Sequence, residues 1–244
     1  YNYADEFRGE VSLDADGNIL IVSSTRSSDI IAVNAAQAFN AGSQDALIAK
    51  LNPTLSQVLW LTYFGGTGDD SGFSITENDL GEHYICGGTS SSTLNLGASG
   101  AQSNYGGGAA DAFIMRLSPA GNQMSGGTFW GSSSYDQAYF IETDANGFVY
   151  IFGQTTAAGS ALIQNAAYGT PNSGNLLSKF NANLDTNIWS TVIGTGNGKP
   201  NLSPSAFLVD YCNRVYISGW GVSDLVNNPL NPNNGLHAMF NMPT

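Results

Sequence analysis

Short apolar runs alternate with polar turns along the whole chain. In LDADGNILIV (13–22), a polar Asp-x-x-Gly-Asn cluster separates two apolar segments, a pattern typical of a β-hairpin. In QDALIAKLNP (44–53), successive side chains alternate between two faces, as they do in a strand. VLWLTYFGG (58–66) is an aromatic and β-branched run that ends at glycines. These segments predict four short antiparallel strands.

The same blocks recur in the same order. The hairpin cluster returns with its leading residue at Asp14, Asn78, Asp144 and Asp210, separated by 64, 66 and 66 residues. QDALIAKLNP returns as ADAFIMRLSP (110–119) and, more weakly, as GNLLSKFNAN (174–183). VLWLTYFGGTGDD (58–70) returns as SGGTFWGSSSYD (125–136) and NIWSTVIGTGNG (187–198). Three blocks that share one period indicate a repeated structural unit.

Each hairpin turn carries a residue suited to a left-handed backbone. Gly17, Gly81 and Gly147 stand at the equivalent place in the first three units, and Asn213 replaces them in the fourth. Glycine adopts positive φ without steric cost, and Asn tolerates it best among the other residues. We therefore expect positive φ at all four positions.

A repeat of four antiparallel strands predicts an all-β fold, a β-propeller with one blade per repeat. We place the repeats at approximately 6–69, 70–135, 136–201 and 202–244, so the chain covers about 3.75 blades of a larger ring. The last unit is expected to stop before its third and fourth strands, which indicates a piece of a longer chain. A β-solenoid is the alternative architecture. Ala-rich stretches near 32–39 and 161–168, after the second strand of their units, suggest a helical turn.

Composition narrows the classes of function. Seven Lys and Arg residues against 19 Asp and Glu give a formal charge of −12, which opposes binding to the phosphate backbone of nucleic acids. No apolar run approaches the length of a membrane-spanning helix. Cys86 and Cys212, with His83 and His237, are too few and too scattered to predict a disulfide framework or a zinc site. We expect no cofactor except, as one alternative, Ca²⁺.

An acidic position repeats just before the first strand of each unit. Asp5–Glu6, Asp69–Asp70 and Tyr135–Asp136 occupy it in the first three units, and Leu202 interrupts the series. In a propeller these loops meet on one face near the axis, so Glu6, Asp70 and Asp136 are candidate ligands of Ca²⁺. The alternative is structural, with each Asp accepting hydrogen bonds from backbone N–H groups of the glycine turn and fixing one blade to the next.

Two further patterns have a functional and a structural interpretation. DADGN (14–18) begins like a calcium-binding loop, but the EF-hand reading fails because Thr25 stands at position 12 instead of Glu, which favours a plain Asx-type hairpin turn. Exposed aromatic rings could stack on sugars. Trp60 and Trp189 are equivalent in the repeat, which favours packing between blades, whereas Trp130 and Trp220 are not and are the candidate ligand-binding residues.

Motifs for catalysis are weak. There is no G-x-S-x-G, and GGTGDD lacks the Lys-Ser/Thr of a phosphate-binding loop. A glycosidase carboxylate pair depends on geometry that spacing alone does not give, and Asp70 or Asp136 are its candidates.

The repeated unit resembles a known bacterial family. QDALIAKLNPTLSQVLWLTYFGGTGDDSGFSI, followed by a glycine turn and CGGTSSS, is similar to the SBBP β-propeller repeat. The fourth unit, LSPSAFLVDYCNRVYISGWG, resembles gliding-motility-associated surface proteins of Bacteroidetes that carry a type IX secretion sorting domain. The resemblance implies a propeller in a secreted or surface-anchored multidomain protein of a Gram-negative bacterium. It brings no established catalytic motif.

These observations favour a non-catalytic scaffold or adhesion module, at the cell surface or outside the cell, that contacts other surface proteins or glycans within a larger assembly. Two alternatives stay open. One is a lectin-like binder, with or without Ca²⁺. The other is a carbohydrate-active propeller that cleaves glycans.

Overall fold

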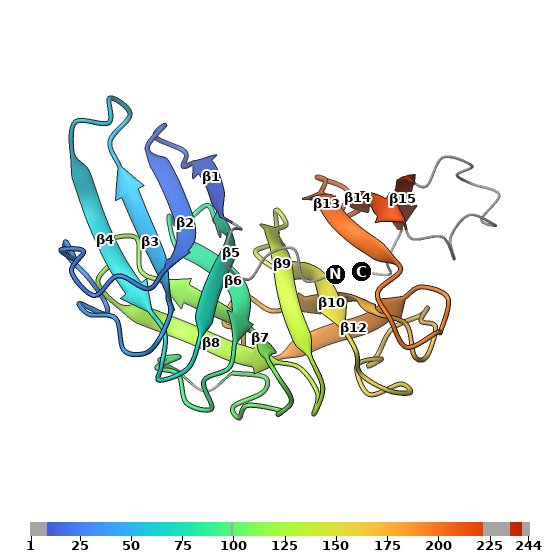
Figure 1. Ribbon diagram of the computed structural model, residues 1–244. Coiled ribbons are helices and arrows are strands. Elements are labelled where there is room, and N and C mark those ends of the chain that lie inside the picture. Colours follow the sequence, from blue (N-terminus) through green and yellow to red (C-terminus); the bar gives the residue numbers. More distant parts are fainter. Residues whose placement is uncertain (1–8, 99, 222–234, 241–244) are drawn as a thin grey trace.

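The computed structural model describes residues 9–98, 100–221 and 235–240, and all regular structure in these residues is β (Figure 1). No helix in this part of the chain is long and apolar enough to cross a membrane. The strands form four antiparallel sheets, and in each sheet the strands are hydrogen-bonded in chain order.

The first two sheets hold four strands each. The first blade consists of β1 (Glu10–Leu13), β2 (Ile19–Thr25), β3 (Asp45–Leu51) and β4 (Val58–Phe64). The second consists of β5 (Asp70–Glu77), β6 (His83–Thr89), β7 (Asp111–Leu117) and β8 (Met124–Trp130).

The third blade repeats this order and the fourth follows it through three strands. The third consists of β9 (Asp136–Thr143), β10 (Val149–Thr155), β11 (Asn175–Phe180) and β12 (Asn187–Ile193). The fourth consists of β13 (Leu202–Val209), β14 (Val215–Gly221) and β15 (Gly235–Phe240).

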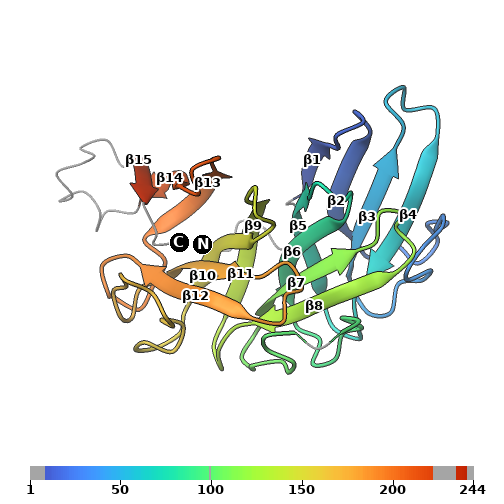
Figure 2. The same ribbon diagram turned by 180° about the vertical axis from the view of Figure 1, so that it is seen from behind.

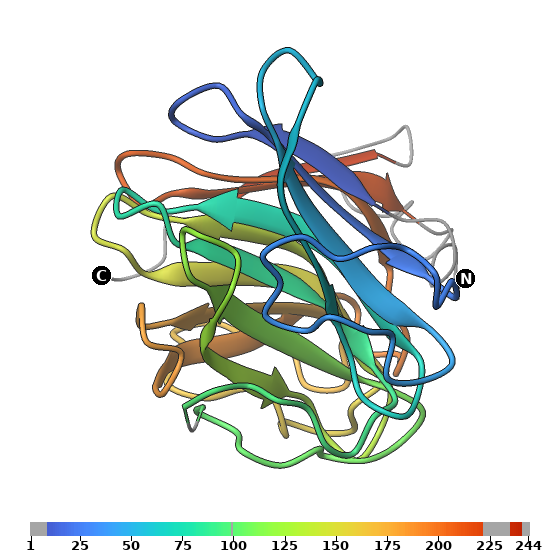
Figure 3. The same cartoon turned by 90° about the vertical axis from the view of Figure 1, so that its left-hand side faces the viewer.

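The sheets are arranged as the blades of a β-propeller. The first strands, β1, β5, β9 and β13, lie toward the middle, and β4, β8 and β12 lie at the outside (Figures 1 and 2). Strand β5 packs against β2 of the preceding blade and β9 of the following one. Seen from the side of the first blade, the sheets are layered face to face (Figure 3). The blades follow an arc that does not close, and antiparallel meanders exclude the β-solenoid alternative.

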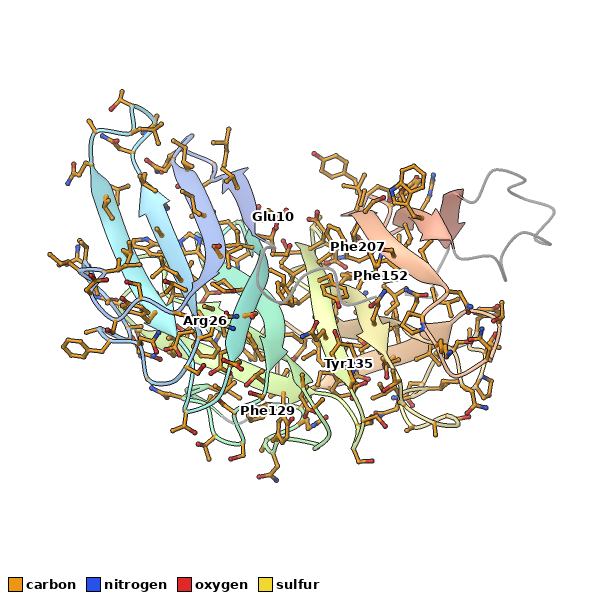
Figure 4. All side chains as sticks on the ribbon, viewed as in Figure 1. Glu10, Arg26, Phe129, Tyr135, Phe152 and Phe207 are labelled. Carbon is orange, nitrogen blue, oxygen red and sulfur yellow. The ribbon has the colours of Figure 1, made fainter. Side chains whose placement is uncertain are left out.

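The hydrophobic core lies between the blades. Aromatic contacts span all three junctions, among them Phe64 with Phe113, Trp130 with Phe180, and Phe152 with Phe207, with ring centroids 4.9, 5.0 and 5.7 Å apart. Phe152 and Phe207 come from neighbouring sheets in Figure 4. Each junction therefore buries apolar side chains from two sheets, and no blade has a core of its own.

Both Ala-rich stretches belong to loops without a helix, so the expected helical turns are wrong; the second includes one tight turn, in which the Ile163 N–H donates to the Ser160 carbonyl. Val33 forms an antiparallel bridge with Leu61 on β4, and Gln164 forms one with Ser190 on β12. These loops run along the free edge of the outer strand and satisfy backbone groups that would otherwise be left open. The extra length of the repeat therefore covers the blade edge.

The fourth repeat extends one strand further than its sequence pattern suggested. Strand β15 pairs antiparallel with β14 along its whole length, so GLHAMF takes the place of the third strand. The preceding segment hides this relationship because it does not match the second loop of the other repeats.

Positive φ occurs at all four predicted turn positions, with φ of 79° at Gly17, 73° at Gly81, 80° at Gly147 and 60° at Asn213. This confirms the prediction and allows a clean test. A Cβ at Gly147 would meet only Ala182, at 3.9 Å, so any cost of substitution comes from the backbone. We expect Gly147→Ala to lower the free energy of unfolding by about 1–2 kcal/mol.

Urea denaturation measures this loss. Gly147→Asn is the matched variant, because Asn already occupies the equivalent turn at position 213, and we expect it to lose clearly less stability. Equal losses in the two variants would show that the left-handed backbone is not what the position requires.

Candidate functional site: the hairpin face

The four turns between the first and second strands share one construction. In the turn 14–18, Asp14 Oδ1 accepts hydrogen bonds from the backbone N–H groups of Asp16 at 2.9 Å and Asn18 at 2.7 Å. The carbonyl or carboxylate oxygens of Asn78, Asp144 and Asp210 accept the same pair of bonds in their own turns. This confirms the Asx-type turn. We call the surface formed by turns 14–18, 78–82, 144–148 and 210–214 the hairpin face.

Basic side chains of the third strands lie beneath these turns. Lys50 Nζ on β3 lies 2.6 Å from Asp14 Oδ2, and Lys179 Nζ on β11 lies 3.5 Å from Asp144 Oδ2. Arg116, at the equivalent place on β7, lies 3.7 Å from Glu82 Oε1. Burial raises the pKa of Asp14, but hydrogen bonds from Lys50 and Asn18 outweigh it and hold this pKa at about 2. The few basic residues here thus compensate acids inside the blades.

A cavity of about 640 Å³ opens on the hairpin face between the first three blades. We call it the acidic cavity, because five carboxyl side chains besides that of Asp14 line it: Glu10, Asp16, Glu77, Asp79 and Glu142. Glu77 contacts both of the first two blades, because it lies 3.6 Å from Lys50 on β3 and 3.3 Å from His83 on β6. Glu10 and Glu142 come from the inner strands β1 and β9 of two different blades.

The environments of Glu10 and Glu142 differ. Glu10 Oε2 accepts a hydrogen bond from the backbone N–H of Ile75 at 3.0 Å, which ties β1 to β5 (Figure 4). Glu142 is half-buried, and burial together with the charge of Glu10 raises the pKa of Glu142 to about 7. One carboxyl that holds its proton near neutral pH beside another that accepts hydrogen bonds can serve binding or acid–base chemistry.

A second cavity of about 730 Å³ adjoins the first, because Asn78, Asp79 and Leu80 line both. We call it the tyrosine cavity. Three exposed side chains border it, with exposed fractions of 77 % for Leu80, 53 % for Leu208 and 97 % for Tyr211. Polar groups of Asn146 and Asn183 complete its wall. An exposed aromatic ring above amide and carboxylate groups can contact ligands through both apolar and hydrogen-bonding surfaces.

Asp70 and Asp136 lie away from both cavities. Each is fully buried where two blades meet. Asp70 Oδ2 accepts a hydrogen bond from the backbone N–H of Gly66 at 2.7 Å, and Asp136 Oδ2 accepts one from that of Ser132 at 2.6 Å. In the structural alternative to Ca²⁺ binding, each Asp accepts hydrogen bonds from backbone N–H groups of the preceding turn, and these bonds agree with that alternative. Glu6, the third candidate ligand of Ca²⁺, lies outside the described residues, among which no group of three or more His, Cys, Asp or Glu side chains could hold a metal ion.

The two tryptophans predicted to bind ligand have opposite surroundings. Trp130 is 4 % exposed, and its Nε1–H donates to Ser178 Oγ at 3.0 Å across the second junction, so this ring is occupied by packing. Trp220 on β14 is 72 % exposed and stays a candidate contact residue. The repeated Trp60 and Trp189 are buried, as packing between blades requires.

Among the described residues, neither His83 nor the two cysteines form a nucleophilic site. His83 is fully buried 5.1 Å from the Trp60 ring, and burial lowers the pKa of His83 to about 4. Cys86 is buried, and Cys212 is exposed as a free thiol.

The spacing of the repeats did not identify Glu10, Glu142 or Tyr211 as candidate site residues. None of the three residue types recurs at its repeat position: Ser74 and Phe140 stand at the place of Glu10, Thr76 at that of Glu142, and Asp79 at that of Tyr211. The one signal in the sequence that could have pointed to these residues is that they differ from their counterparts in the other repeats.

No protein-family model and no curated protein matches the chain. Solved structures do. A protein of unknown function from Dyadobacter fermentans has a TM-score of 0.48 and 15 % identity, over 87 % of this chain and 48 % of that one. A protein of unknown function from Bacteroides caccae has a TM-score of 0.43 and 12 % identity, over 89 % and 59 %.

An exo-β-1,3-galactanase from Phanerochaete chrysosporium, solved with β-1,3-galactotriose, has a TM-score of 0.42 and 11 % identity, over 88 % and 43 %. The chain thus spans about half the length of the structures that it resembles. These values assign no activity to it.

The raised pKa of Glu142 gives a direct test. We expect the Glu142 carboxyl to titrate near pH 7 in side-chain ¹³C NMR, and Glu10→Gln to lower this pKa because a neighbouring negative charge is removed. The folded pKa lies above the ordinary value, so this carboxyl's contribution to stability is complete below about pH 4.5 and is lost as the pH rises through about 7. Glu82→Gln, in the other cavity, is the control. An unchanged Glu142 titration in Glu10→Gln contradicts the assignment.

Proposed function

We propose that this chain is a non-catalytic contact segment of a larger β-propeller protein, secreted or held at the surface of a Gram-negative bacterium. Its contact surface is the hairpin face, and its partners are glycans or other surface proteins. The similarity of its repeats to SBBP propellers and to gliding-motility-associated surface proteins supports this location.

The observation that carries the proposal is the grouping of exposed apolar side chains on the hairpin face. Leu80, Leu208 and Tyr211 border the tyrosine cavity, and Leu13 lines the adjoining acidic cavity with 68 % of its surface exposed. Apolar side chains that gather around a polar concavity are a common feature of interaction sites. Turn residues can vary without disturbing the blades, which suits recognition.

Charge limits the class of partner. The acidic cavity presents the carboxyl groups of Asp16, Asp79 and Glu142 in a chain of formal charge −12. Acidic polysaccharides and nucleic acids would be repelled by this surface. Neutral glycans, or proteins with a basic or neutral patch, are therefore the favoured partners.

Substitution of the exposed tyrosine tests the proposal. We expect Tyr211→Ala to weaken binding to a neutral-glycan array or to immobilised surface proteins by roughly tenfold or more, because the ring supplies the largest exposed contact area. Tyr168→Ala is the matched control, since Tyr168 is 54 % exposed on the loop between β10 and β11. Equal binding by both variants and the parent protein would place the contact elsewhere, with Trp220→Ala as the next variant.

A second candidate function is glycan cleavage by Glu10 and Glu142. The observation that favours it is the proton held by Glu142 near neutral pH, as a general acid requires, beside Glu10 in an open cavity. Asp70 and Asp136 are unsuitable for this role because they are buried between blades.

Reducing-sugar release on a panel of neutral polysaccharides separates the two functions. A catalytic pair predicts release that Glu142→Gln abolishes while the fold, followed by circular dichroism, is unchanged. The contact module predicts binding to the array without release. Asp16→Asn, which removes another acid of the same cavity, is the matched control.

A further inference from the structure

Four carboxyl groups are buried where the first three blades meet. Asp45 and Asp70 lie at the first junction, between the sheets β1–β4 and β5–β8. Asp111 and Asp136 lie at the second, between β5–β8 and β9–β12. All four have no exposed surface. Burial of two ionised carboxylates side by side is strongly unfavourable, so the charge of each pair needs an explanation.

Each pair converges on one glycine. A Cβ atom placed on Gly65 would meet Asp45 Oδ1 at 2.5 Å and Asp70 Oδ2 at 2.8 Å. A Cβ atom on Gly131 would meet Asp111 Oδ1 and Asp136 Oδ2, both at 3.0 Å. The carboxyls of each pair are therefore close neighbours, and the glycine is required because any side chain would separate them.

Within each pair, one carboxyl accepts hydrogen bonds at both oxygens. Asp70 accepts from the Gly66 N–H, from Ser91 Oγ at 2.8 Å and from Thr89 Oγ1. Asp136 accepts in the same way from the N–H and hydroxyl of Ser132 and from Thr155 Oγ1. Donors on both oxygens stabilise the ionised form.

The other carboxyl of each pair accepts hydrogen bonds at only one of its two oxygens. Asp45 Oδ2 accepts from Gln37 Nε2 at 2.8 Å and from the Ala41 N–H at 2.9 Å, and Asp111 Oδ2 accepts from the Gly106 N–H. Oδ1 of Asp45 and Oδ1 of Asp111 are buried and have no hydrogen-bond partner among the described residues. These are the two oxygens that face the glycine and the partner carboxyl.

The third junction uses amides instead. Asn175 begins β11 as Asp45 begins β3 and Asp111 begins β7. Asn201 Oδ1 accepts from the Thr195 N–H at 2.8 Å, as Asp70 does from Gly66, and lies 2.6 Å from a Cβ placed on Gly194. Leu202 holds the repeat position of Asp70 and Asp136, and Asn175 Oδ1 accepts hydrogen bonds from the backbone N–H groups of Asn201 and Leu202. Two neutral amides therefore occupy the place that the carboxyl pairs have at the other junctions.

The hydrogen bonds described for the four carboxyls all come from neutral groups. The donors are backbone N–H, side-chain amide and hydroxyl groups. The ionisable neighbours are Asp69, beside Asp70, and Tyr105, whose pKa is raised by burial and by Asp111 and Asp136. Arg26, which follows the register partner of Asp45, has an exposed side chain.

We propose that each of the first two junctions contains one carboxylic acid and one carboxylate, with the acid proton on Asp45 Oδ1 or Asp111 Oδ1 and directed at the partner carboxylate. The blades are then joined by a shared proton, and release of that proton to solvent leaves two like charges that weaken the junction. Burial and the neighbouring carboxylate raise the pKa of Asp111 to about 7 and also raise that of Asp45. Burial raises the pKa of Asp70 and of Asp136 too, but there the hydrogen bonds to both oxygens oppose it.

The raised pKa values determine how the stability of the fold depends on pH. A folded-state pKa above the unfolded value means that the folded protein binds more protons, so Asp45 and Asp111 stabilise the fold most at low pH. For Asp111 this contribution is lost as the pH rises through about 7. His83 and Asp14 have lowered pKa values and change stability in the opposite direction. The test therefore compares variants with the parent at each pH.

The variant Asp45→Asn/Asp111→Asn copies the third junction. We expect its melting temperature relative to the parent to rise between pH 4 and 7 by on the order of 5 °C and then to stay level. Asn175→Asp, which adds an acid at the third junction, should give a difference of opposite slope. Asp16→Asn, an exposed acid, is the control. Differences from the parent that do not change with pH overturn the proposal.

Infrared spectroscopy of the parent protein labelled with ¹³C-Asp gives an answer even if the double variant does not fold. A protonated-carboxyl band that persists at pH 6 and weakens in Asp45→Asn or Asp111→Asn supports the shared proton. A fully ionised spectrum at that pH refutes it. So does a rise in melting temperature with added Ca²⁺ that these variants lose, because a bound cation would then neutralise the pair.

Discussion

The fold depends on burying both faces of each sheet against its neighbours. A single sheet of this chain has no separate core, and its aromatic rings meet rings of the next blade, as Phe64 meets Phe113 and Trp130 meets Phe180. Close approach of two sheets also buries the backbone ends of their inner strands, whose polar groups then need partners inside the protein. Asp70 and Asp136 supply those partners, which explains why an acid recurs at the first residue of an inner strand although a buried acid is costly.

The cost of burying an acid also explains why the acids at the blade junctions differ from those on the hairpin face. Carboxyls at the blade junctions are enclosed between two sheets and have no exposed surface. Acids on the hairpin face are instead compensated from below, as Lys50 compensates Asp14, or left in open cavities, as Glu142 is. Residues that repeat therefore maintain the blades, and residues that break the repeat, such as Glu10 and Tyr211, give the hairpin face its individual chemistry.

Periodicity predicted the architecture well because each structural requirement recurs. Positive φ at Gly17, Gly81, Gly147 and Asn213 was evident from the turn chemistry alone. The conformation of residues 32–39 was not, because Ala favours helices in isolation while the free edge of β4 offers Val33 two backbone hydrogen bonds. The sequence also did not show which aromatic side chains are exposed. Trp130 and Trp220 both stand outside the repeat pattern, yet Trp130 packs on Phe180 whereas Trp220 is mostly exposed.

The site was the least predictable part because it combines residues from blades that are distant in sequence. Glu10 and Glu142 influence each other only because β1, β5 and β9 converge toward the middle of the arc. The carboxyl pairs also combine residues of two blades, since Asp45 begins β3 of the first blade and Asp70 begins β5 of the second. A periodic sequence shows that such residues recur, but only the curvature of the blades decides which of them meet. The change to Asn175 can be seen in the sequence at the repeat position of Asp45 and Asp111, and the Leu202 that interrupts the series of Asp70 and Asp136 accompanies it in the same repeat. Substitutions that occur together in one repeat are therefore evidence of contact across a blade junction.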